Sequence, residues 1–331
     1  MRIYLLITLS ILLLTSCKDN PIESQPIKNK VLKTNEVVFF SSDMDGNATN
    51  IFMMTPDGEI IKQITRYEWG EYVATAISPD SNQLLFYQAN PGLGIEVGME
   101  IYIYKIKEDT ILGPITDGHP GNFSPNGNEF VFHRHTFTME GGYESIYLYD
   151  LQTNTEKKLT EDGKTSFFPK ISPDGNHICY ESASFLDTLS YWQLHLMDIN
   201  GNYISSLTLP ASGYYAGNPN FSPDGNSIIF SYNERTLRYD ICKIDIETKE
   251  INYLTKSRYS GDPSSLPNYY NPYINSSNYI YFHSKKYDPY PTLVTEIFGI
   301  DLAGNNFKQI TNNGHWNSDP VAGKVSYYIE E

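Results

Sequence analysis

The stretch Pro169-Lys170-Ile171-Ser172-Pro173-Asp174-Gly175 decides the fold, because the chain repeats it. Further copies are Thr75-Ala76-Ile77-Ser78-Pro79-Asp80, Gly121-Asn122-Phe123-Ser124-Pro125-Asn126-Gly127 and Pro219-Asn220-Phe221-Ser222-Pro223-Asp224-Gly225, with a degenerate one at Pro272-Tyr273-Ile274-Asn275-Ser276-Ser277. A short apolar segment follows each copy, at 83–87, 129–133, 177–181, 227–231 and 279–283. Strand-like units that recur every roughly 20 to 50 residues are typical of a propeller.

The Ser-Pro-Asp-Gly tetrad has the chemistry of a tight turn. Proline fixes φ at the value needed in the second position of a type I turn, and Asp or Asn suits the third. Glycine then adopts the positive φ that lets the chain reverse into the next strand. The tetrad therefore predicts one hairpin in every repeat, between an inner strand and a second strand.

A second landmark, Leu-Thr or Ile-Thr, closes each unit, at 64–65, 115–116, 159–160, 207–208, 254–255 and 310–311. Before it lies a segment in which apolar and polar residues alternate, at 51–54, 101–104, 146–149, 194–197, 241–244 and 297–300. Alternation with a period of two among β-branched and aromatic residues indicates strands. Four strands per unit and six such units in the sequence predict an all-β, six-bladed β-propeller of four-stranded antiparallel blades.

These linked repeats resemble those of the TolB-like β-propeller family, which is related in shape to WD-type propellers. The resemblance covers about residues 36–331 and implies the fold. It implies less about function, because scaffolds, receptors and a few enzymes share this propeller. TolB itself carries an α/β domain ahead of its propeller, and the short stretch before the first strand here predicts a stand-alone propeller instead.

The amino terminus has the features of a lipoprotein signal. Arg2 supplies the positive start, residues 3–14 are apolar, and Leu14-Thr15-Ser16-Cys17 resembles a lipobox, in which Cys17 receives the lipid. Lys18-Asp19-Asn20 resembles the charged export tag of some lipoproteins and favours the outer membrane of a Gram-negative bacterium. We therefore expect a signal peptide at 1–17, a flexible tether at 18–35 and the propeller at 36–331, although an ordinary signal peptide with a chance cysteine is the alternative.

Charge and cysteine content narrow the classes of partner. The formal net charge is −15 and the isoelectric point is near 4.9, so the surface should repel nucleic acid. Apart from Cys17, the cysteines are Cys179 and Cys242, which we expect to be buried and unpaired rather than joined in a disulfide.

The two ends of the chain predict how the ring closes. The chain enters the repeats with a second-strand pattern, Val37–Phe40, and ends with an additional inner-strand pattern, Ser318–Ala322. We expect the C-terminal strand to complete the first blade, which removes its exposed edge. Val325–Ile329 also has a second-strand pattern and competes with Val37–Phe40 for one place, and the sequence leaves that choice open.

No catalytic motif is found in the sequence, and we expect no cofactor. Asp43-Met44-Asp45-Gly46-Asn47 resembles the start of a calcium loop, but Met54 stands where the bidentate Glu would be needed, so a plain turn is favoured. His133, His135 and His283 form a weak candidate metal set, since oligogalacturonate lyases of the TolB-like type use histidines near the channel. Packing or loop hydrogen bonding is the commoner role of such residues.

Aromatic residues are frequent where an outer strand leads into the next inner strand. In propellers these connections gather on one face, around the mouth of the channel, where large amphipathic rings can anchor peptides or sugars. Some of these rings could equally serve blade packing. The candidate ligand face comprises Tyr67, Trp69, Tyr72, His119, Phe167, Tyr214, Tyr215, Tyr269, Tyr270, His315 and Trp316.

Together these features predict a lipid-anchored propeller of the cell envelope that binds a protein or peptide partner without catalysis. A glycan is the second candidate ligand, and the membrane is contacted through the N-terminal lipid. One rival is a polysaccharide-active enzyme of the oligogalacturonate-lyase type. The other is a structural scaffold in the periplasm with no small-ligand site.

Overall fold

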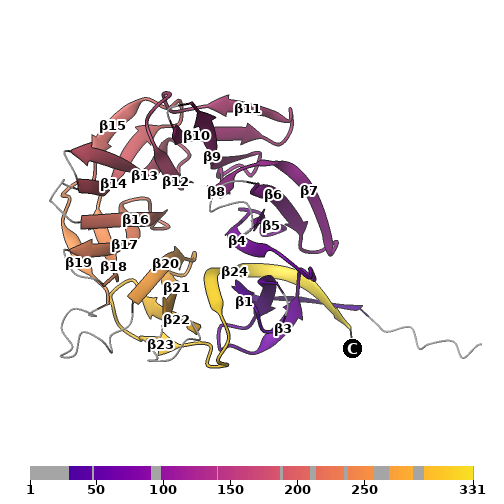
Figure 1. Cartoon of the computed structure of the whole chain (residues 1–331). Helices are drawn as coiled ribbons and strands as arrows, with labels where there is room; N and C mark the ends of the chain where they lie inside the picture. The colour runs from indigo at the N-terminus through magenta and orange to yellow at the C-terminus, as the bar shows by residue number, and fades with distance from the viewer. Residues whose placement is uncertain are drawn as a thin grey trace, which may run out of the picture.

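The computed structural model describes residues 30–46, 48–90, 98–139, 141–186, 189–208, 214–234, 238–255, 268–285 and 294–330. Their strands form an all-β propeller, in which the sheets are arranged around a common centre (Figure 1). In this part of the chain, no helix has the length and apolar character needed to cross a membrane.

Four of the sheets have four strands each. The first, in spatial order, consists of β24 (Asn317–Glu330), β1 (Lys30–Ser42), β2 (Asn50–Met54) and β3 (Ile60–Gln63). The second consists of β4 (Glu71–Ile77), β5 (Gln83–Ala89), β6 (Glu100–Lys105) and β7 (Thr110–Asp117). The third consists of β8 (His119–Phe123), β9 (Glu129–Thr138), β10 (Gly141–Asp150) and β11 (Thr155–Lys158). The last consists of β20 (Asn268–Ile274), β21 (Tyr279–Lys285), β22 (Thr295–Asp301) and β23 (Lys308–Gln309).

The remaining sheet has eight strands, so the expectation of six separate four-stranded sheets is met by four of them only. Its first half consists of β12 (Ser166–Ile171), β13 (His177–Leu186), β14 (Leu189–Asp198) and β15 (Tyr203–Ser206). Its second half consists of β16 (Tyr214–Phe221), β17 (Ser227–Glu234), β18 (Asp240–Asp245) and β19 (Ile251–Tyr253). A single parallel bridge between Trp192 and Tyr215 joins β14 to β16 and merges the two units.

The tetrads form the predicted turns, and the serine holds each turn closed. Ser172 Oγ accepts a hydrogen bond from His177 N at 3.0 Å, and Asp174 Oδ1 accepts one from Asn176 N at 3.0 Å. Gly175 adopts the expected positive φ of 76°. In the degenerate copy, the side chain of Asn275 replaces the serine and its Oδ1 accepts from Tyr279 N at 2.9 Å. The hydrogen bonds of the turn are therefore more alike between copies of the repeat than the residue types that make them.

The threonine of the second landmark accepts a hydrogen bond from a buried N–H of the third strand. Thr311 Oγ1 accepts from Ile297 N at 2.8 Å and donates to Glu296 Oε2. Thr65, Thr160, Thr208 and Thr255 accept from their own third strands in the same way, over 2.8 to 3.0 Å. A backbone N–H that is buried without an acceptor is costly, so this contact fixes the outer strand against the third strand.

The C-terminal strand closes the ring as predicted, with β24 innermost and β1 in the second position of the same sheet (Figure 1). Val325–Ile329 does not compete with Val37–Phe40, because β24 runs on as one strand and pairs Val325 with Asn35 and Ile329 with Val31. For the same reason the expected tether boundary at residue 35 is wrong. β1 begins at Lys30, which pairs with Glu330.

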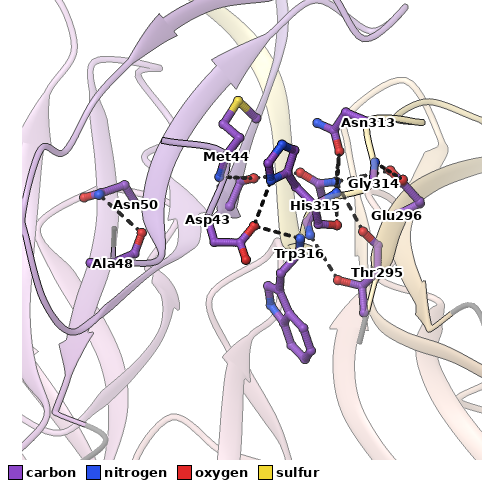
Figure 2. A network of polar contacts seen from close by, with 12 residues as sticks. Asp43, Met44, Ala48, Asn50, Thr295, Glu296, Asn313, Gly314, His315 and Trp316 are labelled. Atoms are coloured by element: carbon purple, nitrogen blue, oxygen red, sulfur yellow. Dashed lines mark hydrogen bonds and ion pairs between the residues drawn. The ribbon is translucent and has the colours of Figure 1, made fainter. Parts of the chain in front are cut away.

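A network of polar contacts ties the C-terminal strand to the first and last blades (Figure 2). Asn317 lies at its centre: its Oδ1 accepts from Ser42 Oγ at 2.8 Å and its Nδ2 donates to Thr295 O at 3.2 Å. Asp43 Oδ1 accepts from Trp316 N at 2.9 Å. Asp43 therefore has a structural role, which agrees with the turn predicted for Asp43–Asn47; within it, Gly46 N donates to Asp43 O at 2.9 Å.

The hydrophobic core lies between neighbouring blades. Ala76, Leu85 and Ile103 from the second sheet, for example, pack against Phe130 and Phe132 from the third. Such faces exclude water on both sides of each sheet and bring the inner strands together around the centre. Cys179 and Cys242 lie in one buried cluster and, as predicted, are not joined in a disulfide.

Candidate ligand-binding site

The inner strands enclose a cavity of about 480 Å³, which we call the main cavity. Every blade contributes to its wall: Asp319 from β24, Glu71 from β4, His119 from β8, Lys170 from β12, Tyr215 from β16 and Tyr273 from β20. A second cavity, of about 320 Å³, shares Lys170, Asn220 and Tyr273 with the first. These three residues form the neck between the two cavities.

A repeated backbone irregularity presents side chains to the main cavity. Phe168, Asn218, Asn271 and Asp319 each precede a proline in an inner strand and adopt φ values of 46°, 54°, 49° and 50°. Each lies at a bulge in the pairing with the second strand, and each lines the cavity. Asn and Asp tolerate the left-handed region, whereas a bulky aromatic such as Phe168 rarely adopts it.

Two of the three predicted histidines accept hydrogen bonds from this irregular backbone. His133 Nδ1 accepts from Phe168 N at 3.3 Å, and His283 Nδ1 accepts from Asp319 N at 3.2 Å. His135 instead contacts the buried Glu144, with Nδ1 2.6 Å from Oε1. Within the described ranges, no three His, Cys, Asp or Glu side chains are grouped so that they could hold a metal ion. The structure therefore does not assemble the metal set that these histidines would have formed.

Three ionisable groups give the main cavity its electrostatic character. Lys170 Nζ donates to Gly121 O at 2.9 Å, and burial lowers the pKa of its ammonium to about 8. Burial, and then the nearby charge of Asp319, raise the pKa of Glu71. Burial, and then the charge of Lys170, lower the pKa of His119 to about 4, so its imidazole is neutral at pH 7.

Aromatic rings form an unbroken arc, of which Tyr87, His119, His133 and Tyr215 line the main cavity. Neighbouring ring centroids are between 4.3 and 6.3 Å apart, close enough for direct packing. The arc runs, in order, through Tyr87, His119, His133, Phe167, Trp192, Tyr215, Tyr239, Tyr270 and His283.

The residues of the predicted aromatic face lie in different environments: some line a cavity, some are buried and some are at the surface. His119, Tyr215 and Trp316 line the main cavity, and Tyr270 lines a smaller cavity beside Trp316. Tyr72, Phe167 and Tyr269 are buried packing residues. Tyr67 stacks on Tyr72, Trp69 is 62% exposed and His315 lies 3.4 Å from Asp43, but none of the three lines the main cavity. The side chain of Tyr214 lies outside the described residues, as does Cys17.

Sequence reasoning missed Lys170, Glu71 and Asp319, the charged residues of the main cavity. For Lys170 a signal was present, because a lysine stands between Pro169 and Ile171 where the other complete copies have Ala or Asn. A lysine in an otherwise buried inner strand must point toward water, and the only water an inner strand can reach is at the centre of the ring.

Comparison with known proteins agrees with this architecture. Residues 114–271 match the PD40 family model, described as the TolB beta propeller domain. TolB from Acinetobacter baumannii is 18% identical with a TM-score of 0.65, and the match covers 87% of this chain and 66% of that one. The putative TolB from Agrobacterium tumefaciens is 19% identical with a TM-score of 0.56, covering 90% of this chain and 100% of that one.

An oligogalacturonate lyase from Vibrio parahaemolyticus also has a similar structure. It is 13% identical with a TM-score of 0.52, and the match covers 82% of this chain and 73% of that one. At such identities a structural match shows a shared fold alone, so it does not carry the lyase activity over to this chain.

Proposed function

We propose that this chain, a member of the TolB-like β-propeller family, is a cell-envelope protein that binds a protein or peptide segment in the main cavity. The observation that carries the proposal is the cavity itself, about 480 Å³ in volume and lined by the inner strand of every blade. Ligand sites typically measure roughly 300 to 1,000 Å³ and combine apolar walls with a few polar groups.

The lining suits a peptide. Trp316, Tyr215 and Phe168 offer aromatic surface, while Asn218 and Asn271 offer amide groups that can bond a peptide backbone. A glycan would need ring faces open to the solvent, and much of the aromatic arc is packed ring against ring. A peptide segment therefore fits the lining better than a sugar chain does.

We further propose that the eight-stranded sheet counts as two blades, which makes the ring six-bladed. Its halves each have four strands in the same order as the separate sheets, and in the described structure one parallel residue pair is the sole strand pairing between them.

We propose binding without chemistry. The histidines that a lyase would need are engaged elsewhere: His133 and His283 accept backbone hydrogen bonds, and His135 contacts Glu144. Lipidation of Cys17 would hold the protein on the outer membrane, with residues 18–29 linking the lipid to β1.

The test compares two tryptophans from the predicted face, of which one lines the cavity and one does not. Peptides selected from a synthetic random library on the mature protein are measured by fluorescence anisotropy. Trp316→Ala should weaken the selected peptides about thirtyfold, as expected for an anchor worth about 2 kcal/mol. Trp69→Ala should leave the affinity unchanged, and both variants should keep the wild-type melting temperature.

The outcome that overturns the proposal is equally specific. If no selected peptide depends on Trp316, the main cavity is not the peptide site. Retention of oligosaccharides in place of peptides would move the assignment to a glycan.

A further inference from the structure

The neck of the main cavity holds a cation with an unusual environment. Lys170 lines both the main and the second cavity, so its side chain lies where the two meet. Among the described residues that line either cavity, it is the sole lysine or arginine. Any anionic group that enters the main cavity therefore meets its one opposite charge at the neck.

The contacts of Lys170 leave both its charge and one of its protons available. The ammonium has three N–H donors, and it donates to Gly121 O at 2.9 Å and to Thr75 O at a long 3.5 Å. No carboxylate of the described residues lies within ion-pair distance of it. A half-buried cation bonded only to neutral carbonyls is stabilised strongly when a carboxylate joins it.

The neighbouring polar side chains at the neck do not compete for such a ligand. Asn220 Nδ2 donates to Pro272 O at 2.6 Å, which joins β16 to β20. The equivalent Asn122 joins β8 to β12 through Ile171, with Nδ2 3.0 Å from the carbonyl oxygen and Oδ1 2.7 Å from the amide nitrogen. The hydroxyl of Tyr273, the third neck residue, is hydrogen-bonded to the backbone of Ile77. Lys170 is therefore the group at the neck that is left to bind a ligand.

The acidic groups lie elsewhere along the same cavity. Glu71 and Asp319 line the main cavity but not the second one. The pKa of His119 responds to Lys170 and to Asp319 in opposite directions, which places its ring within reach of both charges. The cavity thus presents a positive end at the neck and a negative region away from it.

We propose that the main cavity binds the C-terminal end of a peptide, with the terminal carboxylate paired to Lys170 at the neck. This inference rests on the proposed function and names the part of the partner that enters. A chain terminus fits because its carboxylate supplies the negative charge that Lys170 lacks, whereas the backbone of an internal segment carries no charge. Residues before the terminus pass Glu71 and Asp319, so a basic side chain one to a few positions from the end is favoured.

The experiment uses matched libraries of synthetic hexapeptides, one with free C-terminal carboxylates and one with C-terminal amides. On the mature wild-type protein, the free acids should be retained at least about tenfold better than their amides, as expected for a charge-assisted hydrogen bond. Lys170→Met should abolish this preference. Lys107→Met removes an exposed lysine and should preserve it.

A second readout does not depend on the variant folding correctly. In wild-type protein with isotope-labelled lysine, NMR titration follows the pKa of Lys170 itself. A bound free-acid peptide should raise that pKa above about 8, because an opposite charge favours the ammonium, whereas the amide should leave it unchanged.

Equal retention of acids and amides by a Trp316-dependent site would overturn this inference and leave the proposed function standing. Loss of all Trp316-dependent peptide binding would overturn both.

Discussion

At the scale of single residues, one position shows how the blades are held together. A matching position near the end of the second strand contacts the next inner strand in four units. Tyr87 packs on His119, His133 and His283 accept from Phe168 N and Asp319 N, and Glu181 lies against Gly217. Glu181 is 1% exposed, and a Cβ atom added to Gly217 would lie 2.1 Å from its Oε2. The Tyr215 hydroxyl would lie 2.4 Å from the same added atom, so Gly217 leaves room for both side chains.

Burial raises the pKa of Glu181 from its ordinary 4.5 to about 8, and a hydrogen bond with Tyr215 lowers it in part. The folded protein thus holds this proton more tightly than the unfolded chain does. Glu181 favours folding fully below pH 4.5, and that contribution is lost as the pH rises toward 8.

We predict that Glu181→Gln removes the loss of stability that ionisation of Glu181 causes as the pH rises. Relative to the variant, the wild type should lose stability between pH 5 and pH 8, by at most about 1.4 kcal/mol per pH unit. Urea unfolding at several pH values measures the difference. Glu108→Gln, at an exposed turn position, controls for the removal of a carboxylate. A constant difference between wild type and Glu181→Gln across this range would contradict the prediction.

At the scale of the strand, the hydrogen bond between the landmark threonine and the third strand predicts that a buried and an exposed threonine differ in their contribution to stability. Thr311→Val removes the acceptor of Ile297 N and the donor to Glu296, and both partners are buried. We expect it to lower the free energy of unfolding by about 1 to 3 kcal/mol.

Thr116→Val is the matched control. Thr116 pairs with Ile101 in the strand register, but its hydroxyl contacts Arg134 and Glu156 at the surface. This change should cost less than about 1 kcal/mol, as is usual for exposed polar contacts. Equal unfolding midpoints for the two variants in urea would show that the buried threonine is not needed to hold the outer strand.

The strands themselves were predictable because their signals are local. A proline-centred turn and an alternating segment depend on neighbouring residues only, and β12–β13 shows both signals in one continuous stretch, 169–181. The merging of two units into one sheet was not predictable, because the bridge between Trp192 and Tyr215 depends on how two blades approach each other.

The site was predictable only in part, for a physical reason. Aromatic residues next to an inner strand can face the cavity, as Tyr215 does, or the blade core, as Tyr269 does. The bulge before each proline reverses which side of the sheet the neighbouring side chains face. The alternation of apolar and polar residues therefore does not tell whether an aromatic side chain faces the cavity or the blade core. Lys170 and Asp319 were missed because inner-strand positions were interpreted as packing.

At the scale of the whole molecule, closure depends on β24. We predict that deletion of residues 312–331 lowers the melting temperature by roughly 5 °C or more and causes aggregation, because it uncovers the edge of β1 and removes Asn317. Deletion of 328–331 alone should have little effect, since the inner-strand segment remains. A long truncation that melts like the full mature chain would show that β24 does not close the ring.

The proposed membrane attachment depends on one residue, Cys17. If Cys17 carries the lipid, the protein should partition into detergent and incorporate a fatty-acid probe, and Cys17→Ser should abolish both. Secretion of the Cys17→Ser protein in soluble form would support lipidation at this residue. Unchanged labelling of Cys17→Ser would refute lipidation at this residue.

The contact between Ser42 and Asn317 joins positions 275 residues apart. During synthesis β1 emerges early, and Asn317 in its partner strand emerges 275 residues after Ser42. Until then the first blade has an open edge that any passing strand could occupy, and contacts of such long sequence separation form slowly. We therefore expect nascent chains to need a chaperone until β24 has been made.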